Sequence, residues 1–271
     1  MKRARKMDEA TNRETIQGDL YDYPRYYDLV FGSDWKAEFR FLTQCFSKHS
    51  RATVRRVFEP ACGTGRLMYR LAKAGYEVSG LDLNPHAVEY CNARLARHGF
   101  SGSAFIADMT DFQLPRPVDA AFNTINSFRH LTTERAAQEH LECVARSLRR
   151  GGLYILGLHL TPTKVPPTDE ESWSARRGSL VVNTRLWTTE RDSRRRQERF
   201  RMNYDVFTPT KAFRITDEMV FRTYTLTQFR RLLSRIASLE LIEAYDFSYD
   251  IGRAALLGGE TEDVVFVLGK K

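Results

Sequence analysis

The residues best suited to bind a ligand lie in a glycine-rich loop between Glu59 and Gly65, in the sequence EPACGTG. Gly63 and Gly65 let the backbone approach a ligand closely, and the helix expected after them directs free N–H groups and a positive dipole end at it. Asp82 follows Glu59 by 23 residues, where an open α/β sheet places a carboxylate that binds a ribose diol. This pattern predicts a site for an adenosine-containing cofactor; the alternative is a structural turn without a ligand.

Two features separate this loop from a dinucleotide-binding loop. The dinucleotide fingerprint G-x-G-x-x-G needs a third glycine for close helix packing, and this chain has Met68 at that position. A carboxylate at Glu59 would face phosphates unfavourably but suits a cationic ligand without phosphates. S-adenosylmethionine consists of an adenosine, a sulfonium and an amino acid, and it is therefore the cofactor that the loop predicts.

The segment EPACGTGR, followed by GLDLNP, resembles motif I and the next acidic strand end of class I S-adenosylmethionine-dependent methyltransferases. The resemblance extends to ADM at residues 107–109 and to FNTINSF at residues 122–128, and it covers residues 20–160 well and the remainder more loosely. Ala61 replaces the first motif glycine of many members, as in a common subgroup. The resemblance implies a cofactor site formed by Glu59, Ala61, Cys62, Gly63, Gly65, Asp82, Leu83, Asp108, Met109 and Asn123.

Each residue outside the loop has an expected partner on the cofactor. Asp82 should accept hydrogen bonds from the ribose hydroxyls, with Leu83 beside the adenine. Asp108 can accept a hydrogen bond from the exocyclic amine and Met109 can cover the ring; the alternative for Asp108 is capping the next turn. Asn123 ends the fourth expected strand, where a backbone group can bind the methionine ammonium.

Methyl transfer needs little from the protein beyond alignment, because the sulfonium is already an activated leaving group. A base helps when the acceptor arrives as a protonated amine or a hydroxyl. His130 and His159 follow expected strands at the edge where such sheets bind ligands. Tyr27 is similar to a tyrosine that covers the cofactor in small-molecule amine methyltransferases. These three residues are the catalytic candidates, and the alternative for each is a packing or surface role.

The elements that position these residues alternate between strand-like and helix-like from residue 54 to residue 160, which is typical of a parallel sheet with helices on both faces. A helix at 226–238 and strands at 239–247 and 264–268 would complete the sheet with an antiparallel pair. This ending resembles the seven-stranded methyltransferase sheet, order 3-2-1-4-5-7-6. The predicted fold class is therefore α/β, with a doubly wound and mostly parallel sheet.

Residues 161–223 interrupt this alternation. Runs at 179–189, 195–207 and 211–223 alternate polar with apolar or aromatic residues, which favours an antiparallel sheet with one wet face. This insertion is similar to the lid sheet of sugar-amine and glycine-type N-methyltransferases, which encloses a compact acceptor or forms a homodimer contact. The expected organisation is a flexible basic leader, a cofactor-binding core with N-terminal cover helices, a lid, and the completion of the core, at residues 1–18, 19–160, 161–223 and 224–271.

Composition limits the remaining function classes. Four scattered cysteines without a C-x-x-C pair argue against a disulfide framework or a metal site. No apolar stretch approaches the ~20 residues needed to cross a bilayer, and the basic N-terminus lacks a secretory signal's apolar region. We therefore expect a cytoplasmic protein without a membrane span.

A net charge of +8 permits nucleic-acid binding. However, the arginines at 194–196 alternate with Glu190, Asp192 and Glu198, which favours solvation over an RNA-binding face. A small-molecule acceptor, methylated at nitrogen or oxygen, is the preferred hypothesis. Methylation of RNA or protein, and a non-catalytic S-adenosylmethionine-binding module, remain the alternatives.

Overall fold

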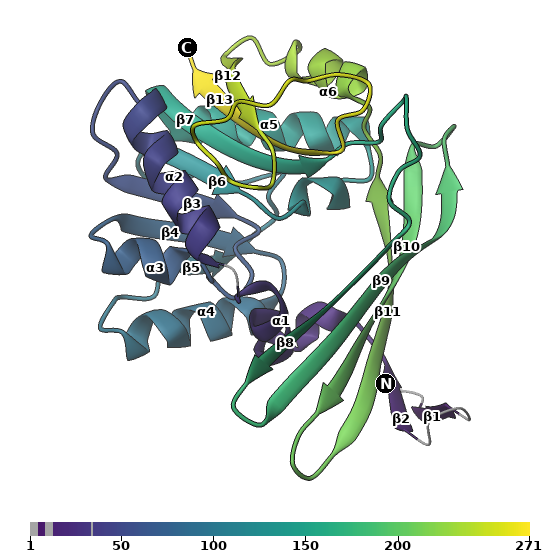
Figure 1. The fold of residues 1–271 in the computed structure, drawn as a ribbon. Helices are drawn as coiled ribbons and strands as arrows, with labels where there is room; N and C mark the ends of the chain where they lie inside the picture. Colours follow the sequence, from purple (N-terminus) through teal and green to yellow (C-terminus); the bar gives the residue numbers. More distant parts are fainter. Residues whose placement is uncertain (1–4, 9–12, 34) are drawn as a thin grey trace. The chain divides into compact units, whose positions relative to one another are not determined.

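The computed structural model describes residues 5–8, 13–33 and 35–271, and contacts divide the chain into two compact units. The core unit comprises residues 35–167 and 222–271 and contains a seven-stranded sheet (Figure 1). The insertion unit comprises residues 1–34 and 168–221 and contains a six-stranded sheet. Each unit is described by itself.

The core sheet has the strand order β12-β13-β7-β6-β3-β4-β5. Five strands are parallel, namely β3 (Arg56–Pro60), β4 (Glu77–Asp82), β5 (Ala104–Ile106), β6 (Val118–Asn123) and β7 (Leu148–His159). β13 (Asp263–Lys270) runs antiparallel to β7, and β12 (Leu239–Tyr245) antiparallel to β13. Numbered along the chain, these strands follow the order 3-2-1-4-5-7-6. The predicted fold class is therefore confirmed.

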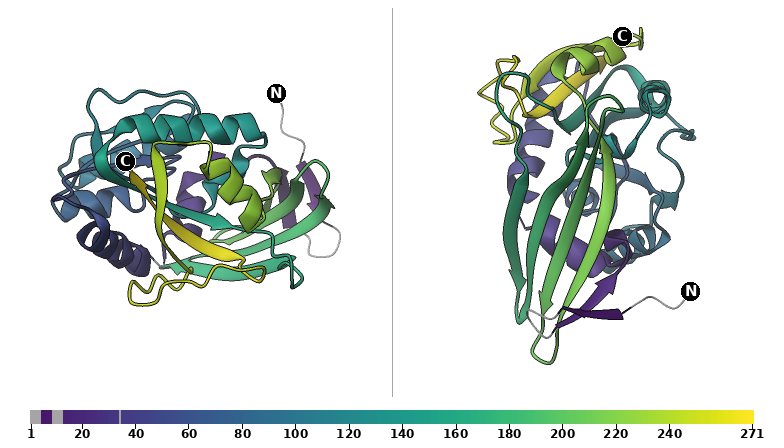
Figure 2. Two further views of the ribbon diagram at one scale, coloured as in Figure 1. Left: turned by 90° about the horizontal axis from the view of Figure 1, so that it is seen from above. Right: turned by 90° about the vertical axis from the view of Figure 1, so that its right-hand side faces the viewer.

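Alternate residues of each core strand enter two separate apolar layers, because successive side chains of a strand point to opposite faces. Val57, Ala120 and Ile155 pack on one face, and their neighbours Phe58 and Ala121 on the other. The first face is covered by α2 (Trp35–His49), α3 (Met68–Lys73) and α4 (Pro85–Arg97), and the second by α5 (Glu134–Ser147) and α6 (Leu226–Leu233) (Figure 2). Because these five strands are parallel, their carboxyl ends lie together at one end of the sheet.

The insertion unit contains β1 (Arg5–Asp8), β2 (Arg13–Gln17), β8 (Glu170–Arg177), β9 (Leu180–Asp192), β10 (Gln197–Phe207) and β11 (Ala212–Arg222). The sheet order is β1-β2-β11-β10-β9-β8, and the three predicted runs form β9, β10 and β11. A short 3-10 helix, η1 (Leu20–Asp22), and α1 (Pro24–Phe31) supply apolar residues that pack with Val182, Tyr204 and Ile215 of this sheet.

The structure differs from the expected organisation in two places. Residues 14–17, expected within a flexible leader, pair in parallel with β11, whereas residues 1–4 and 9–12 lie outside the described part of the chain. This strand has few apolar residues, so its sequence gives little period-2 signal. β8 lies directly after the proline-rich segment and was not predicted, because its polar residues EESWSARR show only a weak alternation.

Candidate functional site

The glycine-rich loop leaves β3 in an unusual backbone conformation. Ala61, Gly63 and Gly65 have φ values of 53°, 52° and 64°, in the left-handed region that costs a residue with a side chain about 1–2 kcal/mol. A β-carbon at position 65 would lie 2.3 Å from Sγ of Cys91 on α4. Only glycine fits there, and left-handed backbone concentrated in one loop is typical of a functional site.

Gly80 on the neighbouring strand β4 allows the glycine-rich loop and Met68 to pack closely against the sheet. A β-carbon on Gly80 of β4 would lie 2.6 Å from Sδ of Met68 and 2.8 Å from Cβ of Cys62. Met68 therefore occupies the position of the third fingerprint glycine without separating the helix from the sheet. The missing glycine is compensated at position 80.

Asp82 fastens this loop to the end of β4. The N–H of Gly63 donates to Asp82 Oδ2 at 2.7 Å, and the N–H of Asn84 donates to Oδ1 at 2.9 Å. The N–H of Cys62 also donates to the carbonyl of Leu81 at 2.8 Å. The structure thus brings Asp82 to the loop as predicted by the spacing, and its role toward a ribose stays a prediction.

Two buried acceptors at this edge have no donor in the described part of the chain. Glu59 Oε2 and Asn123 Oδ1 lie on side chains that are only 6% and 3% exposed. The amide nitrogen of Asn123 donates to the carbonyl of Pro60 at 2.7 Å, so its oxygen lies at the ends of the adjacent strands β3 and β6. A buried acceptor without a donor costs about 1–3 kcal/mol. The pair therefore fits a ligand that brings hydrogen-bond donors.

Electrostatics at Glu59 support the same fit. Burial raises the pKa of the Glu59 carboxyl well above its usual range, and Arg66 only partly opposes this. A cationic ligand would favour the ionised carboxylate. These acceptors therefore suit the ammonium and sulfonium of S-adenosylmethionine better than a pyrophosphate.

Leu83, Asp108 and Met109 lie beyond the ends of β4 and β5. The Leu83 side chain is 64% exposed, so it is accessible to a ligand. Oδ1 of Asp108 accepts from the N–H and the hydroxyl of Thr110, both at 2.8 Å, which is the turn-capping alternative. Contact of these residues with an adenine stays a prediction.

Met109 is held by a buried histidine that the sequence analysis assigned no role. His140 Nδ1 lies 2.9 Å from the carbonyl of Met109, and Nε2 lies 2.8 Å from the hydroxyl of Tyr154. Because a carbonyl only accepts, Nδ1 carries the proton and Nε2 accepts from Tyr154. Burial lowers the pKa of His140 to about 4, so the ring is neutral.

A buried ion pair supports the loop from α2, and no spacing in the sequence predicts it. Both guanidinium NH groups of Arg66 donate to Glu38, each at 2.6 Å. The hydroxyl of Thr124, after β6, donates to the same carboxylate at 2.6 Å. The arginine lies in the recognisable motif, but Glu38 precedes it by 28 residues without any spacing signal.

Two catalytic candidates lie at the carboxyl ends of β6 and β7. His130 ends the 3-10 helix η2 (Ser127–His130), where burial and then Arg129 lower the pKa of its ring to about 4. His159 ends β7, and its Nδ1 contacts the Asp263 carboxylate. The His159 N–H donates at 3.0 Å to the side chain of Asn126, which precedes η2. The structure thus connects the two segments that carry the histidines.

Tyr27 belongs to the insertion unit, whereas every other predicted site residue belongs to the core unit. Its ring centroid lies 4.6 Å from that of Phe31 and 5.5 Å from that of Tyr21. Its role over the cofactor stays a prediction.

The described residues contain no group of three or more side chains arranged to hold a metal ion, and all four cysteines are free and buried. Within the same residues, no helix has the length and apolar character needed to span a membrane.

Comparison with known proteins supports this description. Residues 57–152 match a family model described as a methyltransferase domain. A curated protein of Geobacillus sp. (strain WCH70) that is named as a methyltransferase is 25% identical over 147 residues, covering 54% of this chain and 58% of the relative. The match thus spans little more than half of that relative's length.

Solved structures of similar fold extend over nearly the whole chain. Streptomyces venezuelae DesVI has a TM-score of 0.74 at 18% identity, with 93% of this chain and 98% of that chain covered. CalS10 of Micromonospora echinaspora, an amino pentose methyltransferase solved with S-adenosylmethionine, has a TM-score of 0.71 at 18% identity, with 92% and 96% covered. At such identities the likeness shows the fold, and the family model confirms the methyltransferase resemblance for residues 57–152.

Proposed function

We propose that this chain, whose residues 57–152 carry a methyltransferase domain, transfers a methyl group from S-adenosylmethionine to a small-molecule acceptor. The observation that carries the proposal is the pair of buried, unpartnered acceptors on Glu59 and Asn123 beside a left-handed glycine loop. A cationic amino-acid moiety satisfies both acceptors. A nicotinamide dinucleotide would instead bring phosphates to Glu59.

The remaining contacts follow from the positions of the side chains. Asp82, already fixed by the N–H groups of Gly63 and Asn84, offers a carboxylate to a ribose. Exposed Leu83 covers one side of an adenine, and Asp108 and Met109 border it at the end of β5. When bound, S-adenosylmethionine supplies an activated methyl group on a sulfonium, and the chain supplies orientation.

His159 has contacts that suit it to take a proton from an acceptor. The Asp263 carboxylate contacts Nδ1 and favours the tautomer with a proton there, which leaves Nε2 as the acceptor atom. Phe247 packs edge-on against the ring at 5.0 Å between centroids, which limits its rotation. His130 is neutral because of its burial and can accept a hydrogen bond, but its low pKa makes it a weak base.

A buried hydroxyl in the insertion unit supports an acceptor that is a small polar molecule. Tyr204 is fully buried, and its hydroxyl has no partner in the described part of the chain. Burial, followed by Tyr27, Tyr21, Asp217 and Asp19, raises its pKa well above the usual range. An uncharged phenol without a partner, close to acidic side chains, suits a ligand with hydroxyl or amino groups.

The arginines of the insertion unit favour the small molecule over RNA. Arg185 pairs with Glu170 at 2.7 Å, Arg214 with Asp205 at 2.7 Å, and Arg191 with Asp169 at 3.0 Å. Nucleic-acid binding needs cations that are available to phosphates. Arginines already paired with carboxylates lower the positive potential that such binding requires.

Calorimetry with S-adenosylmethionine and S-adenosylhomocysteine tests the cofactor. Both should bind stoichiometrically, and Asp82→Ala should weaken both by about tenfold or more, because a charged hydrogen-bond partner is lost. Tight binding of NADH with no heat from either sulfur compound would overturn the proposal. For the acceptor, a salt-dependent RNA affinity that disappears when Arg194, Arg195 and Arg196 are neutralised would favour the RNA alternative instead.

A further inference from the structure

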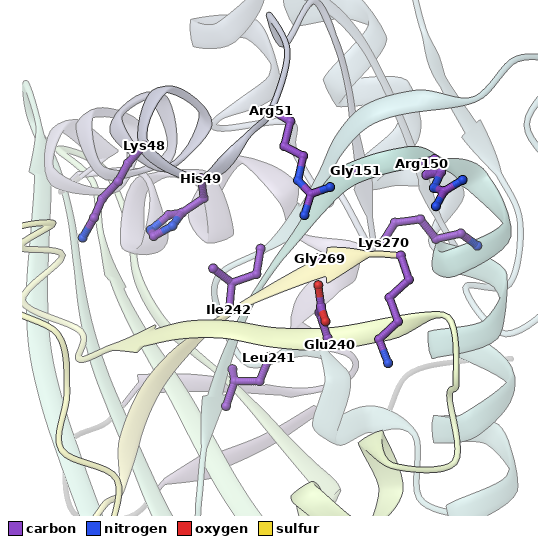
Figure 3. Close-up of a pocket in the computed structure, with 11 residues that line it drawn as sticks. Lys48, His49, Arg51, Arg150, Gly151, Glu240, Leu241, Ile242, Gly269 and Lys270 are labelled. Atoms are coloured by element: carbon purple, nitrogen blue, oxygen red, sulfur yellow. The ribbon is translucent and has the colours of Figure 1, made fainter.

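A cavity of the core unit, about 590 Å³ in volume and lined by the residues drawn in Figure 3, lies at the end of the core sheet where its parallel strands begin. Its walls are the end of α2, the beginning of β7, the beginning of β12 and the end of β13. The loop, Asp82, Asn123 and His159 all lie where their strands end. This basic pocket is therefore separate from the proposed methyl-transfer site.

Cationic side chains dominate the wall of the basic pocket. His49 adds no charge near neutrality, because burial and Lys48 lower its pKa. Glu240 is the one carboxylate among the lining residues. The five cations are Lys48, Arg51, Arg150, Lys270 and Lys271.

Two of these cations already donate hydrogen bonds within the core unit. Lys48 donates to Glu243 and to the hydroxyl of Tyr245, each at 2.9 Å. Lys270 donates at 2.7 Å to the carbonyl of Ala145 near the end of α5, where a cation complements the helix dipole.

Arg51 and Arg150 have no partner among the described residues. The contrast with Arg149 is direct: its side chain lies 3.0 Å from the Asp119 carboxylate and donates to the carbonyls of Ala52 and Thr53. The two adjacent arginines therefore differ in whether their side chains have a partner among the described residues. Arg149 fixes the start of β7, and Arg150 remains available to a ligand.

Two irregularities in the strands shape the pocket. In the β6–β7 ladder, Val118 pairs with Leu148 and Ala120 with Leu153, so residues 149–152 bulge out of the sheet. Gly151 lies in this bulge with a φ of 73°, and a β-carbon there would lie 3.9 Å from Cδ of Arg51. The Arg51 stem therefore lies against the bulge, and a bulge is a typical means of redirecting side chains.

The second irregularity adds an apolar strip. In the β12–β13 ladder, Leu241 pairs with Leu268 and Glu243 with Val267, which leaves Ile242 as the extra residue. Ile242 is partly exposed, and its Cδ1 would lie 2.7 Å from a β-carbon at Gly269. Ile242, which points to the same side of β12 as Arg51 in Figure 3, thus forms a small apolar strip beside free guanidinium groups, whereas Leu241 points to the other side and packs against the core.

We propose that the basic pocket binds a small organic phosphate, a ligand class unrelated to the methyl donor. Two guanidinium groups with five N–H donors each match the oxygens of a phosphate and can bind it bidentately. More than one uncompensated cation favours a dianion over a carboxylate. Ile242 faces the organic part, and Glu240 opposes the anion and limits its affinity.

Calorimetry on the full chain at low ionic strength tests this proposal with phenyl phosphate and inorganic phosphate as probes. Phenyl phosphate should bind saturably and more tightly than inorganic phosphate, because its ring contacts the apolar strip. Arg51→Ala combined with Arg150→Ala should weaken binding about tenfold or more, because charge-assisted hydrogen bonds are lost. Arg231→Ala is the matched control: Arg231 on α6 is exposed, its side chain has no partner in the described part of the chain, and it lies outside the pocket.

Two further measurements keep the test decisive. S-adenosylhomocysteine should bind the double variant as it binds the unaltered chain, which separates this proposal from the proposed function. Glu240→Gln removes the opposing charge without unpairing any residue and should tighten phenyl phosphate binding about two- to fivefold. Absence of saturable binding, equal weakening by Arg231→Ala, or no tightening by Glu240→Gln would each overturn the proposal.

Discussion

At the carboxyl end of the core sheet, buried oxygens of Glu59 and Asn123 have no donor among the described residues, whereas at the amino end the cationic side chains of Arg51 and Arg150 have no acceptor among them. Part of this polarity follows from the helices, whose positive ends lie near the carboxyl ends of the strands and whose negative ends lie near the amino ends. Lys270 at the end of α5 is such a complement.

The helix dipoles do not account for the groups that lack partners. The Glu59 carboxyl is buried, although water would solvate it at the surface. The Arg150 side chain has no partner among the described residues, although the neighbouring Arg149 pairs with Asp119. One sheet therefore presents a site suited to a cation at one end and a site suited to an anion at the other. Four predictions, in order of decreasing effect, test how far each end depends on its charges and how far the glycine loop depends on its packing.

Arg66→Met should be the most damaging change at the carboxyl end. It leaves Glu38 charged and buried, at a cost of about 3–5 kcal/mol in the free energy of unfolding. Arg116→Met is the matched control, because Arg116 pairs with Glu77 at 2.9 Å on the surface, where such a pair contributes about 0–1 kcal/mol. At the amino end, Arg150→Met should change stability by less than about 0.5 kcal/mol. Urea denaturation measures all three, and equal losses would contradict the comparison.

His140 should make the carboxyl end sensitive to acid. Its pKa is lowered from 6.5 to about 4, so the folded ring stays neutral while the unfolded chain takes up a proton. Stability is therefore lost as the pH falls from 6.5 to about 4, by up to about 3 kcal/mol at 1.36 kcal/mol per pKa unit. His140→Gln should flatten this part of the curve in urea titrations between these pH values. Parallel curves for the two proteins would contradict the assignment.

The core fold was largely predictable from the sequence because its signals are local. Glycines at 63 and 65, the acid at 82 and the alternation of strand-like and helix-like segments each act within a few residues. These signals located the loop and its partner Asp82, and the strand order followed from the resemblance to the methyltransferase sheet. The loop sequence also showed that Met68 departs from the dinucleotide fingerprint. It did not show that Gly80 on the next strand makes room for Met68.

The parts that escaped prediction depend on contacts between distant segments. Glu38 joins Arg66 and Thr124 across 28 and 86 residues, and no spacing rule connects them. The basic pocket collects side chains from four elements, and its shape depends on two strand bulges that a period-2 pattern does not indicate. β2 was missed because its parallel pairing with β11 rests on backbone hydrogen bonds rather than an apolar face.

Gly65→Ala should separate packing from backbone strain in the glycine loop. Its β-carbon would meet Cys91 Sγ, so we expect a loss of about 2–3 kcal/mol from left-handed strain plus overpacking. Gly99→Ala is the control for strain alone, because Gly99 has a φ of 80° with nothing within 4 Å of its β-carbon position; it should cost about 1 kcal/mol. Adding Cys91→Ala to Gly65→Ala should recover the packing part. Failure to recover any stability would contradict the close approach as the cause.

Of the four substitutions, Glu59→Gln should cause the smallest change in free energy, and it should affect cofactor binding but not phenyl phosphate binding. The amide keeps the size of the side chain but cannot carry the charge that complements a cation. We expect S-adenosylmethionine and S-adenosylhomocysteine to bind about tenfold more weakly, since a charge-assisted hydrogen bond becomes a neutral one. Phenyl phosphate binding at the other end of the sheet should not change. Calorimetry measures all three ligands on one preparation.

In the free protein, the same substitution should raise the free energy of unfolding, whereas it lowers the affinity for the cofactor. The pKa of Glu59 is raised well above 4.5 by burial, so folding favours its protonated form. Its contribution to stability is complete below pH 4.5 and is lost as the pH rises toward the raised pKa. Glu59→Gln removes this loss, so the free variant should be more stable than the unaltered chain at pH 8 and no more stable at pH 4. A variant that binds the cofactor more weakly yet unfolds at higher urea concentration would identify Glu59 as a residue held for its ligand, because a structural carboxylate would lose stability when replaced.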